Sequence, residues 1–247
     1  MSGDAWTVRE PGPAARACVW CVDLALDAPA LAACAGVLST EERARAARFL
    51  RPVDRDRYAA SHAALRLILG RALGRAPADL AFAERPGGKP ALAEGAGPDF
   101  NLSHSGARAL VAVSPGGRIG VDVEALRPMP DAGRVARTYF APDEAAALAA
   151  RPHPERMPAF MACWTRKEAF VKAVGAGLAL PLARFSVSLP PAPAALLRLA
   201  DDPAAPGAWT MRHLEPGGGT VGAVALEAPD AGIDLFALPP GWPARLA

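Results

Sequence analysis

The chain has 247 residues, of which 51% are hydrophobic, 21% charged and 6% aromatic, and its formal net charge is +2. These values are typical of a soluble globular protein with one large domain or two small ones, and the charge is too small to predict a nucleic-acid partner. Residues 1–17 lack a basic start followed by an apolar run, and no stretch approaches the roughly 20 apolar residues of a membrane span. We therefore expect a cytoplasmic protein with reduced cysteines and no membrane partner.

The first predicted strand lies within residues 15–26 and contains Cys18 and Cys21, which have the spacing of a redox or zinc half-site. Residues three apart in a strand face opposite sides of a sheet, so the two thiols would not converge. No second pair with this spacing exists to complete a zinc site. We interpret both cysteines as structural.

Two helices are predicted next. Ser39 and Glu42 match a capping box, which marks a helix start. This helix is expected to break near Pro52, and a second one to run over residues 54–73, where apolar side chains recur at helical spacing. A strand at 79–84, a Gly/Pro loop at 85–99 and strands at 100–105 and 108–114 follow. The turn at 114–118 is the expected boundary between two halves, residues 1–117 and 118–247.

The second half repeats this order of elements. It has a predicted strand at 119–124, a helical region over 131–175, and strands at 184–189, 209–215 and 220–227. The segment 216–219 is a hairpin signal, and the Pro-rich tail after Ala228 is expected to be an extended strap over the surface. Each half thus combines a long helical segment with a few mostly antiparallel strands, which predicts the α+β fold class.

Two pairs of charged residues stand out. Asp122 and Glu124 are two apart in a predicted strand and so point to the same face, where two like charges repel by about 1 kcal/mol in water and roughly 4 at an effective dielectric constant of 20. Glu168 and Lys172 are four apart in a predicted helix and share a face. By itself, the second pattern favours a surface salt bridge.

Two further segments are ambiguous alone. His104 lies between Ser103 and Ser105, where the serines could bond the backbone of a turn or could join the imidazole in an anion contact. Lys89 follows two glycines and precedes a proline, which predicts a flexible turn. The loop lacks the pattern of a P-loop and the helix that would follow it.

Taken together, these segments resemble the surfactin-type (Sfp-like) 4′-phosphopantetheinyl transferase family. That family shows GKP, N-[IL]-S-H-S, G-[IV]-D-[IV]-E and W-x-x-K-E-[AS]-x-x-K in this order, and the chain matches them at residues 88–90, 101–105, 120–124 and 164–172. The resemblance covers roughly residues 39–226. It implies a monomer with two similar α/β halves related by a pseudo-twofold axis, with the active site between them.

The resemblance also implies a reaction. Family members transfer the 4′-phosphopantetheine arm of coenzyme A to a serine of an apo carrier protein and release adenosine 3′,5′-bisphosphate, with Mg²⁺ as the cofactor. Mg²⁺ prefers oxygen ligands, and Mn²⁺ suits such a site as well. A cation would turn the repulsion between Asp122 and Glu124 into a shared attraction. The residues implied are Asp122, Glu124 and Glu168 for the metal, Glu168 and Lys172 for catalysis, and Arg45, His62, Lys89, Ser103, His104 and Lys172 for coenzyme A.

The chain departs from the family pattern at two positions. His62 replaces a common Arg, and Glu42 lies where some relatives have a basic residue. Docking of an acidic carrier helix is expected near Arg127, Arg134 and Arg137. Lys167 could equally be a structural cation. A Mg²⁺-dependent nucleotide pyrophosphatase and a non-catalytic module that binds carrier proteins are the alternatives, and the sequence leaves open whether the acceptor serves fatty-acid, polyketide or nonribosomal-peptide synthesis.

Overall fold

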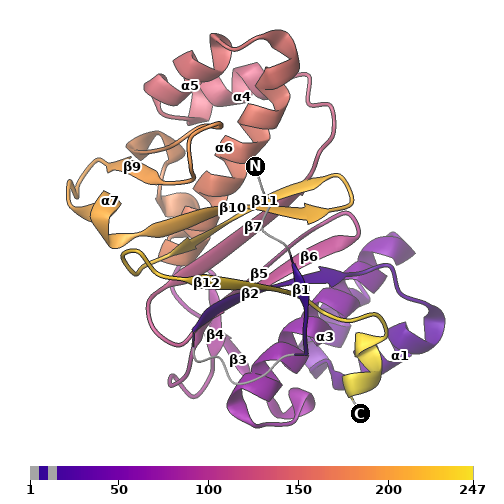
Figure 1. Cartoon of the computed structure of the whole chain (residues 1–247). Coiled ribbons are helices and arrows are strands. Elements are labelled where there is room, and N and C mark those ends of the chain that lie inside the picture. The colour runs from indigo at the N-terminus through magenta and orange to yellow at the C-terminus, as the bar shows by residue number, and fades with distance from the viewer. Residues whose placement is uncertain (1–5, 11–15, 247) are drawn as a thin grey trace.

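Two β-sheets lie face to face between two layers of helices in the computed structural model, which describes residues 6–10 and 16–246 (Figure 1). The order across the first sheet is β1 (Thr7–Val8), β12 (Ile233–Ala237), β2 (Ala17–Asp23), β6 (Arg108–Ser114) and β5 (Asp99–Ser105). The second sheet is antiparallel, with the order β10 (Thr210–Gly217), β11 (Thr220–Leu226) and β7 (Ile119–Ala125). Two short hairpins complete the strands: β3 (Phe82–Glu84) with β4 (Pro90–Leu92), and β8 (Phe185–Val187) with β9 (Leu196–Leu199).

The helices cover the outer faces of the two sheets. On the first sheet lie α1 (Ala28–Val37) and α3 (Pro52–Leu73), and α2 (Thr40–Ala46) contacts α3. On the side of the second sheet lie α4 (Ala132–Tyr139), α5 (Pro142–Ala149), α6 (His153–Val174) and α7 (Ala205–Ala208) (Figure 1). Short 3-10 turns are η1 (Pro77–Asp79), η2 (Gly177–Ala179), η3 (Leu182–Arg184) and η4 (Trp242–Leu246). This arrangement confirms the predicted α+β class, while the pseudo-twofold axis stays a prediction.

Three apolar cores follow from the layers. One lies between α1, α3 and the first sheet, a second between α6 and the second sheet, and the third between the two sheets. Cys18 packs into the first core and Cys21 into the inter-sheet core, and both are free thiols. The two thiols therefore face opposite sides of β2, and the structural interpretation of this pair is confirmed.

Two elements differ from the sequence-based prediction. The tail after Ala228 is not a strap over the surface: β12 lies between β1 and β2 and is parallel to both. Ile233 and Leu235 of this strand enter the inter-sheet core and explain why the tail is drawn into the sheet. The expected helical region 131–175 is three helices, because Pro142 starts α5 and Pro152 precedes α6. Also absent from the sequence-based prediction are α1, α7 and the short strands β1, β4 and β9.

The division into residues 1–117 and 118–247 stays a prediction. Its boundary falls in the turn between β6 and β7, but residues 233–246 of the second predicted half join the sheet and core of the first. No helix in the described part of the chain is long and apolar enough to cross a bilayer. Residues 1–5 and 11–15, on which part of the signal-peptide interpretation depended, lie outside the described residues.

Candidate active site

Helix α6 and strand β7 lie close enough for their backbones to touch, and Gly120 makes this possible. A Cβ atom at Gly120 would lie 2.2 Å from the Ala169 carbonyl oxygen and 2.3 Å from the Ala173 nitrogen. Any side chain there would push the helix away from the strand. The glycine of the G-V-D-V-E segment therefore brings Glu168 and Lys172 of α6 next to Asp122 and Glu124 of β7.

Strand β5 lies along the free edge of β7 and joins it through side chains. Every second side chain of β5 accepts a hydrogen bond from every second backbone N–H of β7, and all of these side-chain oxygens lie on one face of β5. The pairs are Asp99 Oδ2 with Ile119 N (2.7 Å), Asn101 Oδ1 with Val121 N (2.9 Å), Ser103 Oγ with Val123 N (3.3 Å) and Ser105 Oγ with Ala125 N (3.0 Å). The serines thus bond backbone, as one interpretation of the sequence held, but between strands rather than within a turn.

The same serines hold the acids of β7. The Ser103 hydroxyl donates to Asp122 Oδ1 at 2.9 Å, and the Ser105 hydroxyl donates to Glu124 Oε2 at 3.0 Å. Lys172 Nζ donates to Asp122 Oδ1 at 2.6 Å and to Ser103 Oγ at 3.0 Å. Asp122 is buried, and its second oxygen, Oδ2, has no hydrogen-bond partner. A buried carboxylate oxygen without a partner marks a place where a donor or a cation is missing.

Burial raises the pKa values of all three acids, and the charge of Asp122 adds to the rise for Glu124 and Glu168. Burial raises the pKa of Asp122, although Lys172 and Ser103 oppose the rise. Burial and then the charge of Asp122 raise the pKa of Glu124. The pKa of Glu168 is also raised, first by burial and then by Asp122, against the opposing charge of Lys172. The charge of Asp122 therefore disfavours the ionised forms of Glu124 and Glu168, and a cation bound among the three carboxyl groups would favour the ionised forms of all three.

The donor set fits a hard divalent cation. Asp122, Glu124 and Glu168 offer carboxylate oxygens, which such ions prefer, and Asp122 Oδ2 is free to accept one. Within residues 6–10 and 16–246, however, no group of three or more His, Cys, Asp and Glu side chains is arranged closely enough to hold a metal ion. The Lys172 ammonium occupies the other oxygen of Asp122 and supplies the positive charge there. The metal assignment stays a prediction.

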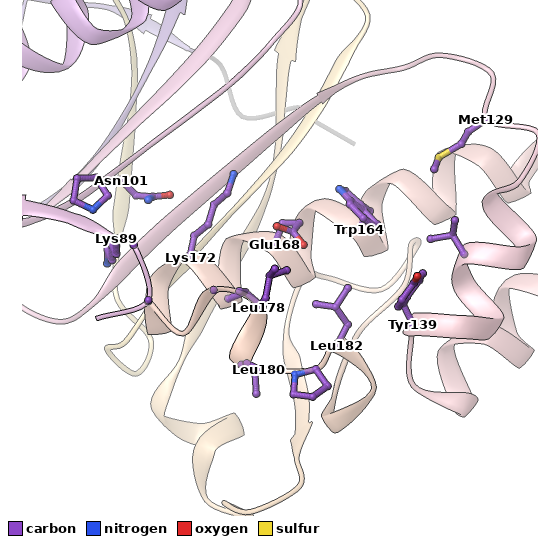
Figure 2. Close-up of a pocket in the computed structure, with 18 residues that line it drawn as sticks. Lys89, Asn101, Met129, Tyr139, Trp164, Glu168, Lys172, Leu178, Leu180 and Leu182 are labelled. Carbon is purple, nitrogen blue, oxygen red and sulfur yellow. The ribbon is translucent and has the colours of Figure 1, made fainter. Parts of the chain in front are cut away.

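A cavity of about 890 Å³ opens beside Glu168 and Lys172 (Figure 2). Its walls are largely apolar and come from α4 and the segment before it, from α6 and the segment after it, and from the loop 87–90 that carries Lys89. The apolar and aromatic wall residues include Trp164, Tyr139, Met129, Leu178, Leu180 and Leu182. Leu178 is fully exposed at this cavity. Of these wall residues, the sequence predicted only the place of Trp164, which begins the motif at residues 164–172.

The residues expected to bind the nucleotide end of coenzyme A lie partly together in the first half. The His62 ring stacks on Tyr58 with centroids 4.0 Å apart, and the Arg45 guanidinium lies 5.8 Å from the Tyr58 centroid. Incomplete solvation, followed by the positive charges of His62 and Lys172, lowers the pKa of His104. Tyr58, which links Arg45 to His62, was missed by the sequence analysis.

The two departures from the family pattern contact each other. His62 Nδ1 lies 2.9 Å from Glu42 Oε1, and Arg66 Nε donates to Glu42 Oε2 at 2.8 Å. Glu42 also accepts from the Ser39 backbone at 2.8 Å, so the predicted capping box is present. The acid at position 42 and the imidazole at position 62 therefore form one hydrogen-bonded group.

Two residues expected to contact coenzyme A, Lys89 and Ser103, are already hydrogen-bonded within the protein. The turn that carries Lys89 was expected to be flexible, but the lysine is buried and its ammonium lies on Asp99 and on two backbone carbonyls. The Ser103 hydroxyl contacts the acidic cluster, as we name the group of Asp122, Glu124 and Glu168. It donates to Asp122 and accepts from Lys172, on the opposite face of β5 from His104. Sequence spacing could have found this, because residues 99, 101, 103 and 105 are polar at a period of two.

Lys167 is a structural cation. It is fully buried, it pairs with Glu144 at 2.7 Å, and it donates to the carbonyl oxygens of Leu182 and Phe185 at 2.8 and 2.7 Å. Glu144 in turn accepts from Val187 N at 2.8 Å. This pair fixes the segment that forms one wall of the cavity, and of the two interpretations of Lys167 the structural one is confirmed.

Comparison with known proteins gives consistent matches. The family model described as the 4′-phosphopantetheinyl transferase superfamily matches residues 118–225. The 4′-phosphopantetheinyl transferase HetI of Nostoc sp. is 39% identical over 195 residues, which cover 78% of this chain and 79% of that relative. The 4′-phosphopantetheinyl transferase Sfp of Bacillus subtilis is 32% identical over 152 residues, or 62% of this chain and 66% of that relative. The chain thus spans just under two thirds of the Bacillus relative and about four fifths of the Nostoc one.

Proposed function

Because this chain belongs to the 4′-phosphopantetheinyl transferase superfamily, as its motifs predicted, we propose that it transfers the 4′-phosphopantetheine arm of coenzyme A to a serine of an apo carrier protein. The products are the holo carrier protein and adenosine 3′,5′-bisphosphate. The observation that carries this proposal is the acidic cluster of Asp122, Glu124 and Glu168 with Lys172 beside the cavity. The relatives are named for transfer, which favours this reaction over a pyrophosphatase or a binding-only module.

The chain's own residues have distinct tasks in this proposal. Glu168 borders the cavity and accepts the proton of the attacking serine hydroxyl. Lys172, held by Asp122 and Ser103 on the same rim, donates to an oxygen of the phosphate under attack. Arg45, His62 and His104 bind the nucleotide end of coenzyme A from the first half.

Asp122, Glu124 and Glu168 would hold Mg²⁺, or Mn²⁺, which suits the same oxygen ligands. When bound, the ion neutralises charge on the pyrophosphate of coenzyme A. Asp122 Oδ2 is the oxygen of this set that lies buried without a partner. We further propose that the protein acts as a monomer in the cytoplasm.

The test is intact-protein mass spectrometry of apo carrier proteins incubated with this protein, coenzyme A and Mg²⁺. The proposal expects the mass of one phosphopantetheine to be added to a carrier. The gain should disappear with EDTA or when the acceptor serine is changed to alanine. Cleavage of coenzyme A without any carrier would instead support the pyrophosphatase. A carrier that binds tightly and never gains mass would support the binding module.

A further inference from the structure

The Lys89 ammonium has used all of its hydrogen-bonding capacity inside the protein. A lysine ammonium has three N–H donors. Lys89 Nζ lies 2.5 Å from Asp99 Oδ2, 2.9 Å from the Ile119 carbonyl oxygen and 3.3 Å from the Ala173 carbonyl oxygen. Its side chain is 4% exposed. No donor remains for a phosphate group of a ligand.

The three acceptors belong to the three elements that build the acidic cluster. Asp99 begins β5, Ile119 begins β7, and Ala173 lies in the last turn of α6, directly after Lys172. Asp99 Oδ2 also accepts from the Ile119 backbone at 2.7 Å, so one carboxylate oxygen joins the lysine to the edge of β7. Lys89 therefore ties the end of the helix to the starts of both strands.

The glycines of this loop allow the lysine to reach that position. A Cβ atom at Gly87 would lie 2.0 Å from the Gly175 carbonyl oxygen, and Gly87 has a φ of +93°. Gly175 ends α6 in the left-handed conformation with a φ of +74°, and a Cβ there would meet the Lys89 side chain at 3.4 Å. The loop backbone thus packs directly on the end of α6, and Figure 2 shows Lys89 beside that end of the helix.

We propose that Lys89 is a positioning residue, which fixes α6 against β7 and thereby sets Glu168 and Lys172 relative to Asp122, and that its side chain binds no part of coenzyme A. This inference rests on the proposed function and replaces the sequence-based assignment of Lys89 to the nucleotide. The cost of misplacing reacting groups is large, since a shift of about 1 Å can reduce a rate about 100-fold. Loss of Lys89 should therefore lower kcat, whereas loss of a ligand contact would lower the affinity for coenzyme A.

The experiment compares Lys89→Met with the wild type on coenzyme A and on 3′-dephospho-coenzyme A, by steady-state kinetics and by calorimetric binding. We expect kcat to fall by about 10- to 100-fold on both substrates. The ratio of kcat/KM between the two substrates should equal that of the wild type, and the Kd for coenzyme A should change less than about threefold, as no charge-assisted contact to the ligand is lost. A variant that binds coenzyme A more weakly while its affinity for the dephospho form is unchanged would overturn the proposal.

Arg85→Met is the matched control, because Arg85 lies on the same loop and contacts the same carboxylate, Asp99, at 3.2 Å, but is half exposed. This control should keep kcat within about twofold of the wild type, as exposed ion pairs contribute little. If Lys89→Met does not fold, Lys89→Met combined with Asp99→Asn removes both buried charges, which is far less costly than leaving one unpaired. Wild-type kcat in the folded double variant would refute the positioning role. Absence of transfer by the wild type would refute the proposed function instead, while the two binding affinities would still test whether Lys89 contacts the ligand.

Discussion

Helix α6 carries two lysine–carboxylate pairs, Lys167 with Glu144 and Lys172 with Asp122, and the two differ in how completely they are hydrogen-bonded. The Lys167 side chain is 0% exposed and its ammonium donates to one carboxylate and two carbonyl oxygens. Both oxygens of Glu144 are also engaged, by backbone N–H groups as well as by Lys167. The Lys172 side chain, in contrast, is 30% exposed, and Asp122 Oδ2 has no partner at all.

The difference separates a structural pair from a candidate site. A buried pair whose donors and acceptors are all satisfied holds elements together, and it has nothing left to offer a ligand. A pair that leaves a buried oxygen free beside further carboxyl groups and a cavity is costly for the folded protein alone. Such a cost is found at sites that bind ions or substrates.

Glu168→Gln changes the carboxyl group next to the Lys172–Asp122 pair and should have the largest effect. We expect transfer to fall by about 100- to 10,000-fold, the range typical of losing a positioned general base. Stability against urea should stay the same or rise, because the raised pKa of Glu168, caused first by burial and then by Asp122, shows that its charge is unfavourable in the folded chain. Glu155→Gln, an exposed acid in the first turn of α6, is the control. Wild-type rates in the Glu168 variant would remove it from the mechanism.

Lys167→Met changes the fully hydrogen-bonded Lys167–Glu144 pair and should lower the stability of the fold rather than the rate of transfer. Removing one partner leaves Glu144 buried and uncompensated, which costs about 3–5 kcal/mol of unfolding free energy. Urea unfolding measures this loss. The double variant with Glu144→Gln should recover part of it, since the remaining amide still accepts from Val187. A Lys167→Met protein as stable as the wild type would contradict the structural role.

A third hydrogen-bonded group lies in the first half, where Glu42 contacts His62 and Arg66, and its contribution to stability should depend on pH. Burial alone would raise the pKa of Glu42, but His62, the Ser39 backbone and Arg66 outweigh it and hold the pKa at about 2, below its ordinary value of 4.5. This difference corresponds to about 3 kcal/mol. Because the pKa is lowered on folding, the stabilisation is present above pH 4.5 and is lost as the pH falls towards 2.

Glu42→Gln should therefore reduce the unfolding free energy by up to about 3 kcal/mol at pH 7 and by less than about half of that near pH 3. Urea unfolding at the two pH values measures the change. A loss of stability that is the same at pH 3 and pH 7 would show that the Glu42 charge does not stabilise this group. Glu84→Gln, which changes an exposed acid of β3 in the same half, is the control.

The sequence predicts the elements of this fold better than their partners. The strand of residues 119–124 and the hairpin at 216–219 are visible in local alternation and turn residues, and both are present. The place of β12 in the sheet cannot be seen in such local patterns, since its pairing with β2 joins residues that are more than 200 positions apart. Local patterns carry no information on such pairings, and α1 was missed because its alanine-rich segment has almost no apolar periodicity.

The candidate site follows the same rule. Asp122, Glu124, Glu168 and Lys172 were predicted from their spacing and from the family motifs. In the structure Glu168 and Lys172 line the cavity, and the buried Asp122 pairs with Lys172. What the motifs could not indicate was which polar residues are already bonded. Lys89 and Ser103 have the chemistry of phosphate ligands, yet Asp99 and Asp122 engage them from other strands. The period of two over residues 99–105 indicates that these side chains share a face, but the groups that they bond are seen only in the tertiary structure.

The smallest expected effect concerns the rim of the cavity, where a carrier protein is predicted to dock. The exposed arginines of this rim are Arg127, which precedes α4, and Arg134 and Arg137 on α4. The same helix contributes Val135 and Tyr139 to the cavity wall. Charges on such a rim act mainly on encounter rates and are screened by salt. Arg137→Ala should therefore raise the KM for an acidic carrier about two- to fivefold at low ionic strength and leave kcat unchanged.

The same substitution should have little effect at about 0.5 M salt, where the Debye length is only a few ångströms. Arg71→Ala, which removes an exposed arginine from α3 in the first half, controls for net charge. An equal rise in KM with both variants would show that overall charge, not the α4 face, attracts the carrier. A fall in kcat with Arg137→Ala would mean that α4 also shapes the cavity beside Glu168. The rim would then be part of the active site around Lys172 and Asp122, and not only a surface that attracts the carrier protein.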